Sequence, residues 1–370
     1  MREVLFVAAE ASADLHAAGV AAELRRLRPD LALAGVGGAR MAAEGVSILE
    51  PAERLAVMGF VEVLRHIPKH KALLDRFTRR LAAGNVALVV LLDYPGFNMK
   101  LAAAAAGLGV PVLYYITPQV WAWHASRLTK LARTVTRAAV ILPFEEALLR
   151  EHGVDATFVG HPLLDRATAL PTRAEARRQL GLAEEGEVLA LFPGSRAQEI
   201  ARHLDDFVGA ARELERRRPG LRVVVSVAPT VRLDAERCPY PMVHSASFPV
   251  LRAADAALCK SGTTTLEAAV AGCPLVVAYR TNGLTYALAR RLVKVPRIGL
   301  VNVVGGREIA PELVQDALSA GAAADALDPL LDPGSPARQR MLEGLAEVRG
   351  KLGTPGAAAR VAAMASDLAR

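Results

Sequence analysis

A turn in the second half of the sequence could bind a diphosphate. Residues 188–200 read VLALFPGSRAQEI, a buried strand followed by a Pro-Gly-Ser turn and a helix that opens at Arg196. A helix N-terminus after a parallel strand offers free N–H groups and the positive end of a dipole, both suited to phosphate. Gly194 would allow close approach of the backbone, and Arg196 could make a bidentate contact. Taken alone, the turn is equally typical of an ordinary strand-to-helix connection with a solvated arginine.

A second turn of this kind follows at residues 257–272, ALCKSGTTTLEAAVAG. A buried strand ends at Lys260, and Ser-Gly-Thr then opens a helix. Glu267 lies one helical turn beyond Thr263, where a carboxylate suits the two hydroxyls of a ribose; it is equally typical of a helix-stabilising residue that completes a cap. Two such turns together favour a nucleoside-diphosphate ligand. The sequence has no G-x-x-x-x-G-K-[ST] and no G-x-G-x-x-G after its first strand, which disfavours phosphoryl transfer and dinucleotide oxidoreductases.

Asp93 is the candidate for acid–base chemistry. It ends the apolar run LVVLL and begins DYPGFN, at the edge of the sheet where active sites of open α/β proteins lie. Shielding by Tyr94, Pro95 and Phe97 would raise the pKa of this carboxyl and suit it to act as a general base. The pattern alone favours the simpler interpretation, that Asp93 caps the helix beginning near Gly96.

Two further loops carry polar or aromatic residues after predicted strands. The first, VAAEASADLH, holds Glu10, Ser12 and Asp14, which suit a sugar or its phosphate and are equally typical of helix caps. The second, YYITPQVWAWH, holds Trp121 and Trp123, whose rings could stack on sugar or lipid but are more often core residues.

These residues need two parallel sheets to position them. Apolar strands are predicted at 3–8, 31–36, 87–92, 112–116, 137–142 and 156–159, and again at 187–192, 222–227, 255–259 and 274–278. Helices are predicted at 15–28, 60–82, 97–107, 122–133, 144–152, 197–218, 247–254, 264–271, 283–294, 335–352 and 355–369. We therefore expect two α/β domains, residues 1–165 and 172–354, joined through a polar, proline-containing linker around residues 160–172. The helix at 355–370 is expected to pack back on the first domain.

The composition agrees with a two-domain globular chain. It has 370 residues, 52% of them hydrophobic, and a net charge of +7, which favours an anionic partner without choosing among phosphate, nucleic acid and acidic lipid. The three cysteines are scattered, so we expect neither disulfides nor a zinc site, and a reducing compartment. The uncharged residues 101–123 are broken by glycines and prolines, so we expect no membrane-spanning helix there.

In order along nearly the whole chain, the motifs resemble the lipid-A-disaccharide synthase family of the Gram-negative outer-membrane pathway. The matching blocks include ASADLHAAG, GVGGARMAAEG, LAVMGFVEVL, DYPGFN, TPQVWAWHASR, LPFEEALL, VGHPLLD, FPGSR, KSGTTTLEAA, AYR and NVVGGREIAPELVQD. One departure is that the first loop carries Ala9 and Ala13 where the family usually has glycines. An alanine at a position with positive φ would be strained.

The resemblance implies a GT-B fold, with two Rossmann-like parallel-sheet domains facing a central cleft. It implies inverting transfer of 2,3-diacylglucosamine from its UDP derivative to the 6-hydroxyl of 2,3-diacylglucosamine 1-phosphate, giving a β-1,6 disaccharide and UDP. No cofactor and no metal are expected. The base would be Asp93 and the acceptor ligands Glu10, Ser12 and Asp14. The donor ligands would be Gly194, Ser195, Arg196, Ser261, Gly262, Thr263, Thr264, Glu267, Asn302 and Gln315.

Diacyl substrates imply a membrane. Residues 57–74 combine apolar and basic side chains, and we expect Phe60, Leu64 and Ile67 to face anionic lipid on the cytoplasmic side of the inner membrane. From periodicity alone, a helix packed on the sheet is the commoner case. A homodimer is compatible with the sequence, and no nucleic-acid partner is expected. The alternatives are a UDP-sugar epimerase of the same fold and a non-catalytic nucleotide- or lipid-binding protein.

Overall fold

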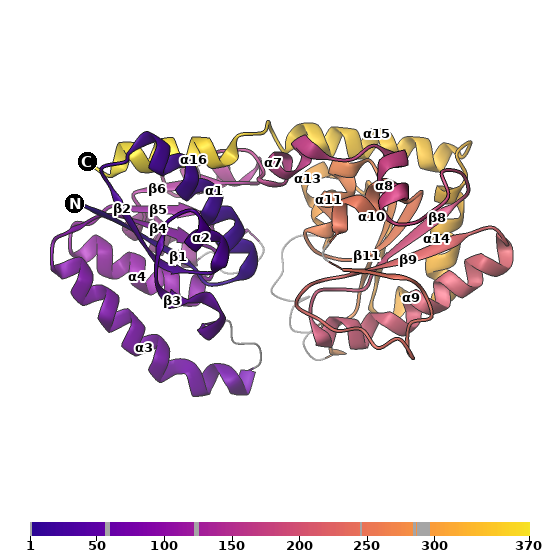
Figure 1. The fold of residues 1–370 in the computed structure, drawn as a ribbon, viewed down its shortest axis with the longest axis horizontal. Helices are drawn as coiled ribbons and strands as arrows, with labels where there is room; N and C mark the ends of the chain where they lie inside the picture. Colours follow the sequence, from indigo (N-terminus) through magenta and orange to yellow (C-terminus); the bar gives the residue numbers. More distant parts are fainter. Residues whose placement is uncertain (1, 56–59, 122–125, 245, 284–285, 287–296) are drawn as a thin grey trace. The chain divides into compact units, whose positions relative to one another are not determined.

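The structure, a computed structural model, describes residues 2–55, 60–121, 126–244, 246–283, 286 and 297–370, with the backbone alone for residues 60–67 and 126. The chain divides into two compact units, the first made of Met1–Asp165 with Gly353–Arg370 and the second of Arg166–Leu352. Residues 166–171, expected as a linker, belong to the second unit. Both units contain a parallel sheet between helices (Figure 1), which confirms the predicted α/β class.

Within the described residues, the sheet of the first unit has seven parallel strands in the order β3-β2-β1-β4-β5-β6-β7. The strands are β1 (Glu3–Ala8), β2 (Ala32–Gly37), β3 (Ser47–Pro51), β4 (Val86–Leu92), β5 (Val112–Tyr115), β6 (Arg137–Val140) and β7 (Ala156–Phe158). Side chains of β1 alternate between two buried clusters, with Leu5 in one and Phe6 in the other. Because both faces are covered, the strands read as continuous apolar runs.

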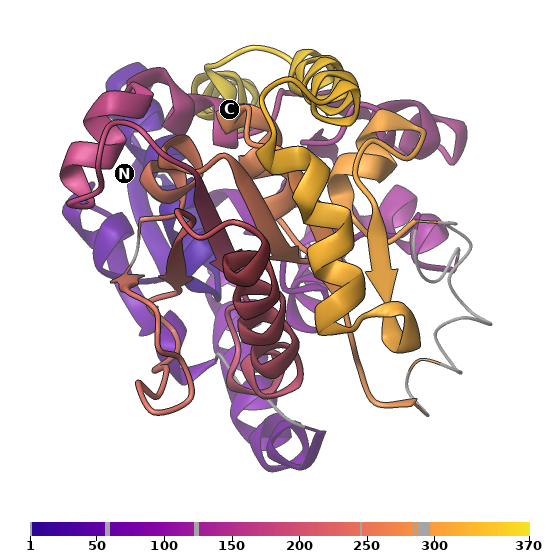
Figure 2. The same cartoon turned by 90° about the vertical axis from the view of Figure 1, so that its right-hand side faces the viewer.

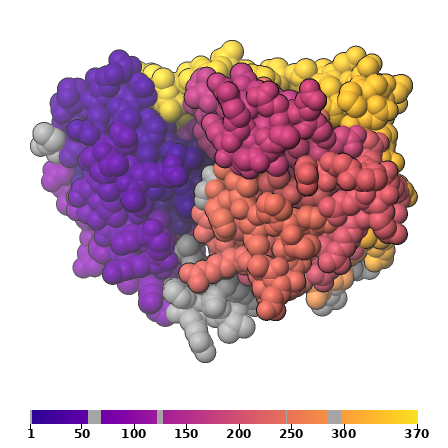
Figure 3. Space-filling model, turned by 45° about the vertical axis from the view of Figure 1, so that its right-hand side comes forward, coloured from indigo at the N-terminus to yellow at the C-terminus, as the bar shows by residue number. Residues whose placement is uncertain are grey.

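Helices cover both faces of this sheet. Those of the first unit are α1 (Ala11–Leu27), α2 (Ala39–Ala43), α3 (Phe60–Ala82), α4 (Pro95–Gly107), α5 (Ser126–Thr134), α6 (Glu145–Glu151) and α16 (Ala357–Leu368). α3, α4 and α5 contribute to one core cluster, and α1 and α16 to the other. The C-terminal α16 packs against α1, and in Figure 3 part of the yellow C-terminal segment lies beside the indigo N-terminal residues.

The second unit repeats this construction. Its described residues form six parallel strands in the order β10-β9-β8-β11-β12-β13. They are β8 (Val188–Phe192), β9 (Arg222–Val227), β10 (Met242–His244), β11 (Ala256–Lys260), β12 (Leu275–Tyr279) and β13 (Glu312–Val314). The helices are α7 (Leu163–Arg166, at the boundary of the units), α8 (Arg173–Gln179), α9 (Ala197–Arg217), α10 (Ser247–Ala253), α11 (Thr264–Ala271), α13 (Leu300–Gly305), α14 (Ala320–Leu331) and α15 (Pro336–Lys351). Figure 2 shows α9 and α14 side by side over the sheet.

The sequence prediction missed the 12-residue helix α14, the shorter helices α2, α8 and α13, and three edge strands. The edge strands β3, β10 and β13 were not predicted, because they have only three to five residues and their side chains are partly exposed. The predicted linker at 160–172 contains α7 and a 3-10 turn, Ala167–Ala169. Most of the helix predicted at 283–294 lies outside the described residues, as do residues 122–125 of the helix predicted at 122–133.

Candidate functional site

Each sheet reverses its strand order at one point, and the candidate residues follow the strands that meet there. In the second unit β8 lies between β9 and β11, and Phe192 pairs with Cys259. The two predicted phosphate turns leave the carboxyl ends of β8 and β11, so they are neighbours. Ligands of open α/β sheets bind at such switch points.

The turn after β8 has a backbone that requires glycine. Gly194 has a φ of +132°, and a Cβ there would lie 2.6 Å from the Cβ of Glu199. Arg196 is the N-cap residue of α9, and its side chain is 55% exposed. The Ser195 N–H donates to the carboxylate of Glu199 over 2.9 Å, and Arg196 lies 3.6 Å from the same carboxylate. The Glu199 carboxylate therefore already occupies the donors of this turn.

The turn after β11 leads into α11. The hydroxyl of Ser261 donates to the carbonyl of Ile298 over 2.7 Å, which holds this side chain against the next loop. Thr263, the N-cap residue, makes no capping hydrogen bond with its side chain, and it is exposed. The ammonium of Lys260, at the end of β11, lies 2.8 Å from the carboxylate of Glu199. Glu199 thus links the two turns, a role that sequence reasoning missed although Glu199 lies in the quoted motif.

Glu267 is buried and paired rather than open to solvent. Its carboxylate lies 3.0 Å from the guanidinium of Arg166, which also stacks over the ring of Phe248 at 4.9 Å. Sequence reasoning had placed Arg166 in a linker and gave it no role. A ribose at Glu267 would share the carboxylate with this arginine.

Asn302 and Gln315, expected as donor ligands, have hydrogen-bond partners within the second unit. Asn302 is fully buried; its amide donates to Ala310 and Glu312 and accepts from Ile309 and Ala310, which uses its full hydrogen-bond capacity. Gln315 has a φ of +55°, and its amide both accepts from and donates to the backbone of Thr281. Asn302 holds the segment from Ile309 to Glu312, and Gln315 holds the loop after β12.

In the first unit the switch point lies between β1 and β4, where Ala8 pairs with Leu92. Asp93 follows β4 directly and is half-buried. Asp93 and Tyr94 both have a φ of +46°, and Ile116, at the end of the neighbouring strand, has a φ of +58°. Such backbone costs about 1–3 kcal/mol for each residue that is not glycine, and it concentrates at functional sites.

Three hydrogen bonds hold the strained backbone of Asp93. Its N–H donates to the carbonyl of Ile116 over 3.2 Å. Its carbonyl accepts from the amide of Asn98 and from the hydroxyl of Tyr114, each over 2.7 Å. α4 begins at Pro95, and its N-cap residue is Tyr94. The N-cap position of α4 is therefore occupied by Tyr94 and not by Asp93. Asp93 lies in a sharp turn between β4 and α4, here called the elbow, whose backbone is fixed by these hydrogen bonds.

Tyr94 ties this elbow to α3. Its hydroxyl donates to the carbonyl of Leu55 over 2.9 Å and lies 2.6 Å from Nε2 of His70. Because the Tyr94 hydroxyl donates its only proton to the Leu55 carbonyl, it must accept the second hydrogen bond, and Nε2 of His70 is the protonated donor. Burial, together with the charge of Glu10, raises the pKa of Tyr94. The phenol therefore stays neutral and keeps its donor.

The loop after β1 uses its three polar residues differently. Glu10 is the N-cap residue of α1, and Ser12 is exposed. The buried carboxylate of Asp14 accepts from the N–H groups of Gly38, Arg40 and Met41 at 2.6–3.2 Å, so it caps α2. Asp14, expected as an acceptor ligand, is thus already bound within the first unit. Ala13 lies in α1, and neither it nor Ala9 has positive φ, so the expected strain at these alanines is absent from the described residues.

The tryptophan loop is anchored by a buried carboxylate. Glu145 accepts from the indole N–H of Trp121 and from the N–H of Leu142, each over 3.1 Å. Trp121 also packs edge-on against Phe144, with ring centroids 5.3 Å apart. Burial raises the pKa of Glu145 to about 7. Trp123 lies outside the described residues.

The predicted membrane segment lies in α3 and the residues before it. The backbone of Phe60, Leu64 and Ile67 is helical, while their side chains and residues 57–59 lie outside the described part of the chain. No helix among the described residues is long and apolar enough to cross a membrane.

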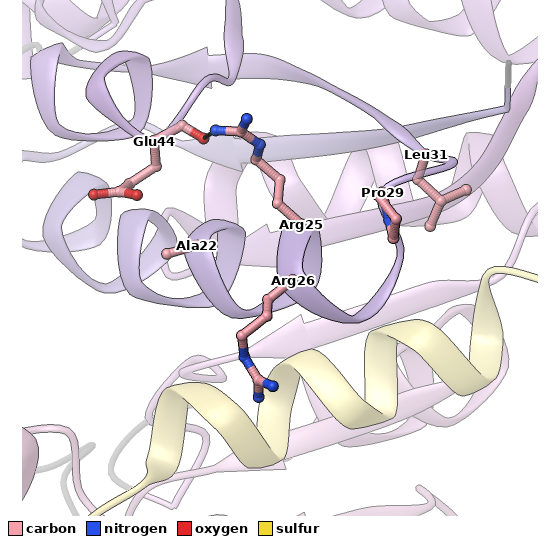
Figure 4. Close-up of a pocket in the computed structure, with 6 residues that line it drawn as sticks. All are labelled: Ala22, Arg25, Arg26, Pro29, Leu31 and Glu44. Carbon is pink, nitrogen blue, oxygen red and sulfur yellow. Dashed lines mark hydrogen bonds between the residues drawn. The ribbon is translucent and has the colours of Figure 1, made fainter.

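A surface pocket of about 370 Å³ lies elsewhere on the first unit (Figure 4). Its lining residues are Ala22, Arg25, Arg26, Pro29, Leu31 and Glu44. It sits at the C-terminal end of α1, away from the carboxyl ends of the strands. Arg25 donates to the carbonyl of Glu44, and Arg26 pairs with Glu23, so both cations are already used.

Known proteins match both the fold and the sequence. The crystal structure of the glycotransferase of kitacinnamycin superposes on this chain with a TM-score of 0.67 at 15% identity, and the match covers 99% of this chain and 98% of that one. A UDP-GlcNAc 2-epimerase from Neisseria meningitidis superposes with a TM-score of 0.59 at 11% identity, covering 99% and 98%. These likenesses define the fold class: two parallel-sheet α/β units of the GT-B type.

The sequence comparisons go further. A family model described as lipid-A-disaccharide synthetase matches residues 4–348. A lipid-A-disaccharide synthase from Myxococcus xanthus (strain DK1622) is 43% identical over 366 residues, which cover 97% of this chain and 95% of that protein. The chain therefore belongs to the lipid-A-disaccharide synthase family, and its enzyme class is that of a hexosyltransferase. The resemblance inferred from the motifs is confirmed.

Proposed function

We propose that the chain transfers 2,3-diacylglucosamine from its UDP derivative to the 6-hydroxyl of 2,3-diacylglucosamine 1-phosphate. The second unit binds the UDP-sugar, and the first unit supplies the base and the acceptor contacts. The observation that carries the proposal is that candidate residues follow the two strands at the switch point of each sheet. The family membership supplies the substrates.

In the proposed reaction the acceptor oxygen attacks the anomeric carbon as the bond from that carbon to the UDP oxygen breaks. Asp93 takes the hydroxyl proton, and attack from the face opposite UDP inverts the configuration. Arg196, the Ser195 N–H and the N-terminus of α11 at Gly262, Thr263 and Thr264 stabilise the charge that develops on the diphosphate. Ser261 and Gly194 shape the two turns, and Glu267 binds the ribose. No metal takes part, so activity should persist in excess EDTA.

The elbow at Asp93 supports its role as the base. The hydrogen bond that Asp93 donates to Ile116 and the two that it accepts from Asn98 and Tyr114 fix its backbone, so the carboxylate starts from a defined position. Preorganised groups act without reorganisation during the reaction. Glu10 and Ser12, on the neighbouring strand end, are the proposed acceptor ligands.

We further propose that the chain binds the cytoplasmic face of the inner membrane through the first part of α3, with Phe60, Leu64 and Ile67 inserted among anionic lipids. The diacyl substrates of the proposed reaction lie in a bilayer, which supports this location.

The test is an assay of the purified chain with both diacyl substrates, in which the disaccharide is detected by mass. Asp93→Asn should lower kcat by roughly 10²–10⁴-fold, as loss of a general base does, with UDP affinity unchanged. A variant that keeps most of the wild-type rate would exclude Asp93 as the base. UDP-sugar conversion without the acceptor would instead favour the epimerase alternative.

A further inference from the structure

Three hydrogen-bond donors of the two phosphate turns converge on one carboxylate. Glu199, in the first turn of α9, accepts from the Ser195 N–H over 2.9 Å and lies 2.8 Å from the ammonium of Lys260. Arg196 is 3.6 Å from the same group. The Glu199 and Lys260 side chains are only 13% and 18% exposed, so this ion pair is largely shielded from water.

The donors around Glu199 are of the kind that bind phosphate. A backbone N–H at a helix N-terminus, a guanidinium and an ammonium are the usual ligands of phosphate oxygens. Lys260 comes from the end of β11 and the other two from the turn after β8, so Glu199 joins both turns. Lys260 also lies 5.9 Å from the ring centroid of Tyr279, which helps to orient its ammonium.

Glu199 keeps its negative charge in this setting. Burial by itself would raise the pKa of Glu199, but the hydrogen bond and the charge of Lys260 and the Ser195 N–H bring it below its usual value. A phosphate that approached Arg196 and Ser195 would therefore meet a carboxylate already bound there. Like charges at such short range repel, so the two anions compete for the same donors.

We propose that Glu199 is a resident counterion of the two turns, that the donor diphosphate displaces it, and that Lys260 then becomes a phosphate ligand. This inference rests on the proposed function, since it takes the UDP-sugar to bind at these turns. Lys260 adds a cation to the donor site, and Glu199 is a positioning residue that holds Lys260 and the turn in place until the donor arrives. It lowers the affinity for UDP and thereby favours product release.

A simpler role for Glu199 gives a different expectation. Glutamate at the third position of a helix often caps its N-terminus. A pure cap would lose stability on substitution and leave UDP affinity unchanged or weaker. The counterion role instead requires that removing the negative charge tightens UDP, and that the gain depends on Lys260.

The experiment measures UDP affinity by calorimetry on the purified full chain. Glu199→Gln keeps the side-chain length and an oxygen for the Ser195 N–H, and it removes the charge. We expect it to tighten UDP roughly threefold to tenfold, the scale of a single ion pair that is shielded from water but not fully buried. Lys260→Met should weaken UDP by a similar factor, and the double variant should lose the gain of Glu199→Gln.

The matched control is Glu213→Gln, which removes the same charge from the other end of α9, where Glu213 pairs with Arg216 and Arg217. It should leave UDP affinity unchanged, and thermal unfolding of each variant verifies its fold. The inference is overturned if Glu199→Gln binds UDP no better than the wild type, or if its gain survives without Lys260. If Glu199→Gln gives one of these two results while Arg196→Ala weakens UDP binding, the counterion role of Glu199 is wrong but the donor site stands. If neither Arg196→Ala nor Lys260→Met changes UDP affinity, the donor site itself is misassigned.

Discussion

Replacing Asp255 with asparagine should destabilise the second unit far more than an ordinary change from a charged to a neutral residue. Asp255 precedes β11 and is buried. Its carboxylate lies 2.6 Å from Arg173 and 3.0 Å from Arg177, and it accepts from the N–H of Val188 over 2.9 Å. Arg338 donates to its main-chain carbonyl over 2.6 Å, and its guanidinium lies 4.0 Å from the carboxylate. A single carboxylate thus faces three guanidinium groups.

The size of the effect follows from the burial of Arg177. That side chain is completely buried, and burial lowers the pKa of its guanidinium, which means that its charge is costly there. Removing one partner of a buried ion pair leaves the other charge uncompensated and costs about 3–5 kcal/mol. We expect Asp255→Asn to lower the free energy of unfolding of the second unit by that amount, and its Tm by about 6–20 °C.

The partner substitution provides the contrast. Arg173 is 42% exposed, so Arg173→Gln should cost only about 0–1 kcal/mol, the usual value for an exposed pair. Urea denaturation of both variants, followed by circular dichroism, measures the difference. A loss below about 1 kcal/mol for Asp255→Asn, or equal losses for the two variants, would refute the account of an uncompensated buried charge.

Three further predictions concern pH, the donor and the membrane. Because burial raises the pKa of Glu145 to about 7 from a usual value of 4.5, the folded chain holds this proton more tightly than the unfolded chain. The free energy of unfolding should therefore fall by about 3 kcal/mol as the pH rises from 4.5 through 7, and denaturation at pH 5 and pH 8 should show a flatter profile for Glu145→Gln. Arg196→Ala should weaken UDP by about 1.5–3 kcal/mol in calorimetry; unchanged affinity would exclude Arg196 as a phosphate ligand. Replacing Phe60, Leu64 and Ile67 with serine should reduce co-sedimentation with anionic vesicles, while equal sedimentation of a folded variant would identify them as core residues.

The sheets and the turns at their switch points could be predicted because they depend on local sequence. Continuous apolar runs identify strands covered on both faces, and β1, β4, β8 and β11 all lie within a residue of their predicted bounds. Gly194, singled out in the first turn, has a φ of +132°, and an added Cβ would lie 2.6 Å from the Cβ of Glu199, so the turn requires glycine.

The partners of the site residues could not be predicted, because they come from distant parts of the chain. Asp14 looked like a cap of its own helix, yet it caps α2, which begins 25 residues later, because the sheet order brings the two elements together. Asn302 and Gln315 matched the family pattern by position, but their amides are bound within the protein. The strain at Asp93, Tyr94 and Ile116 is also tertiary, since neighbouring strand ends impose it on residues that disfavour it.

Carboxylates bind the N-termini of several helices in this chain. Those that come from another element have a structural role, whereas one that belongs to the helix it caps can be exchanged for a ligand. Asp14 caps α2, Asp165 binds the first N–H groups of α16, and Glu312 binds the N–H groups of Ile298 and Gly299 just before α13. Each of these comes from a different element from the helix it caps, so its loss would separate two elements and leave N–H groups unpaired.

Glu199 differs because it belongs to the helix whose N-terminus it occupies, and it lies beside Arg196, which is 55% exposed. A ligand can replace it there without separating elements, and Lys260 can follow the incoming charge with a small movement of its flexible chain. The same chemistry that stabilises those three helix starts leaves a fourth, that of α9 at the switch point of the second sheet, open to exchange with a phosphate.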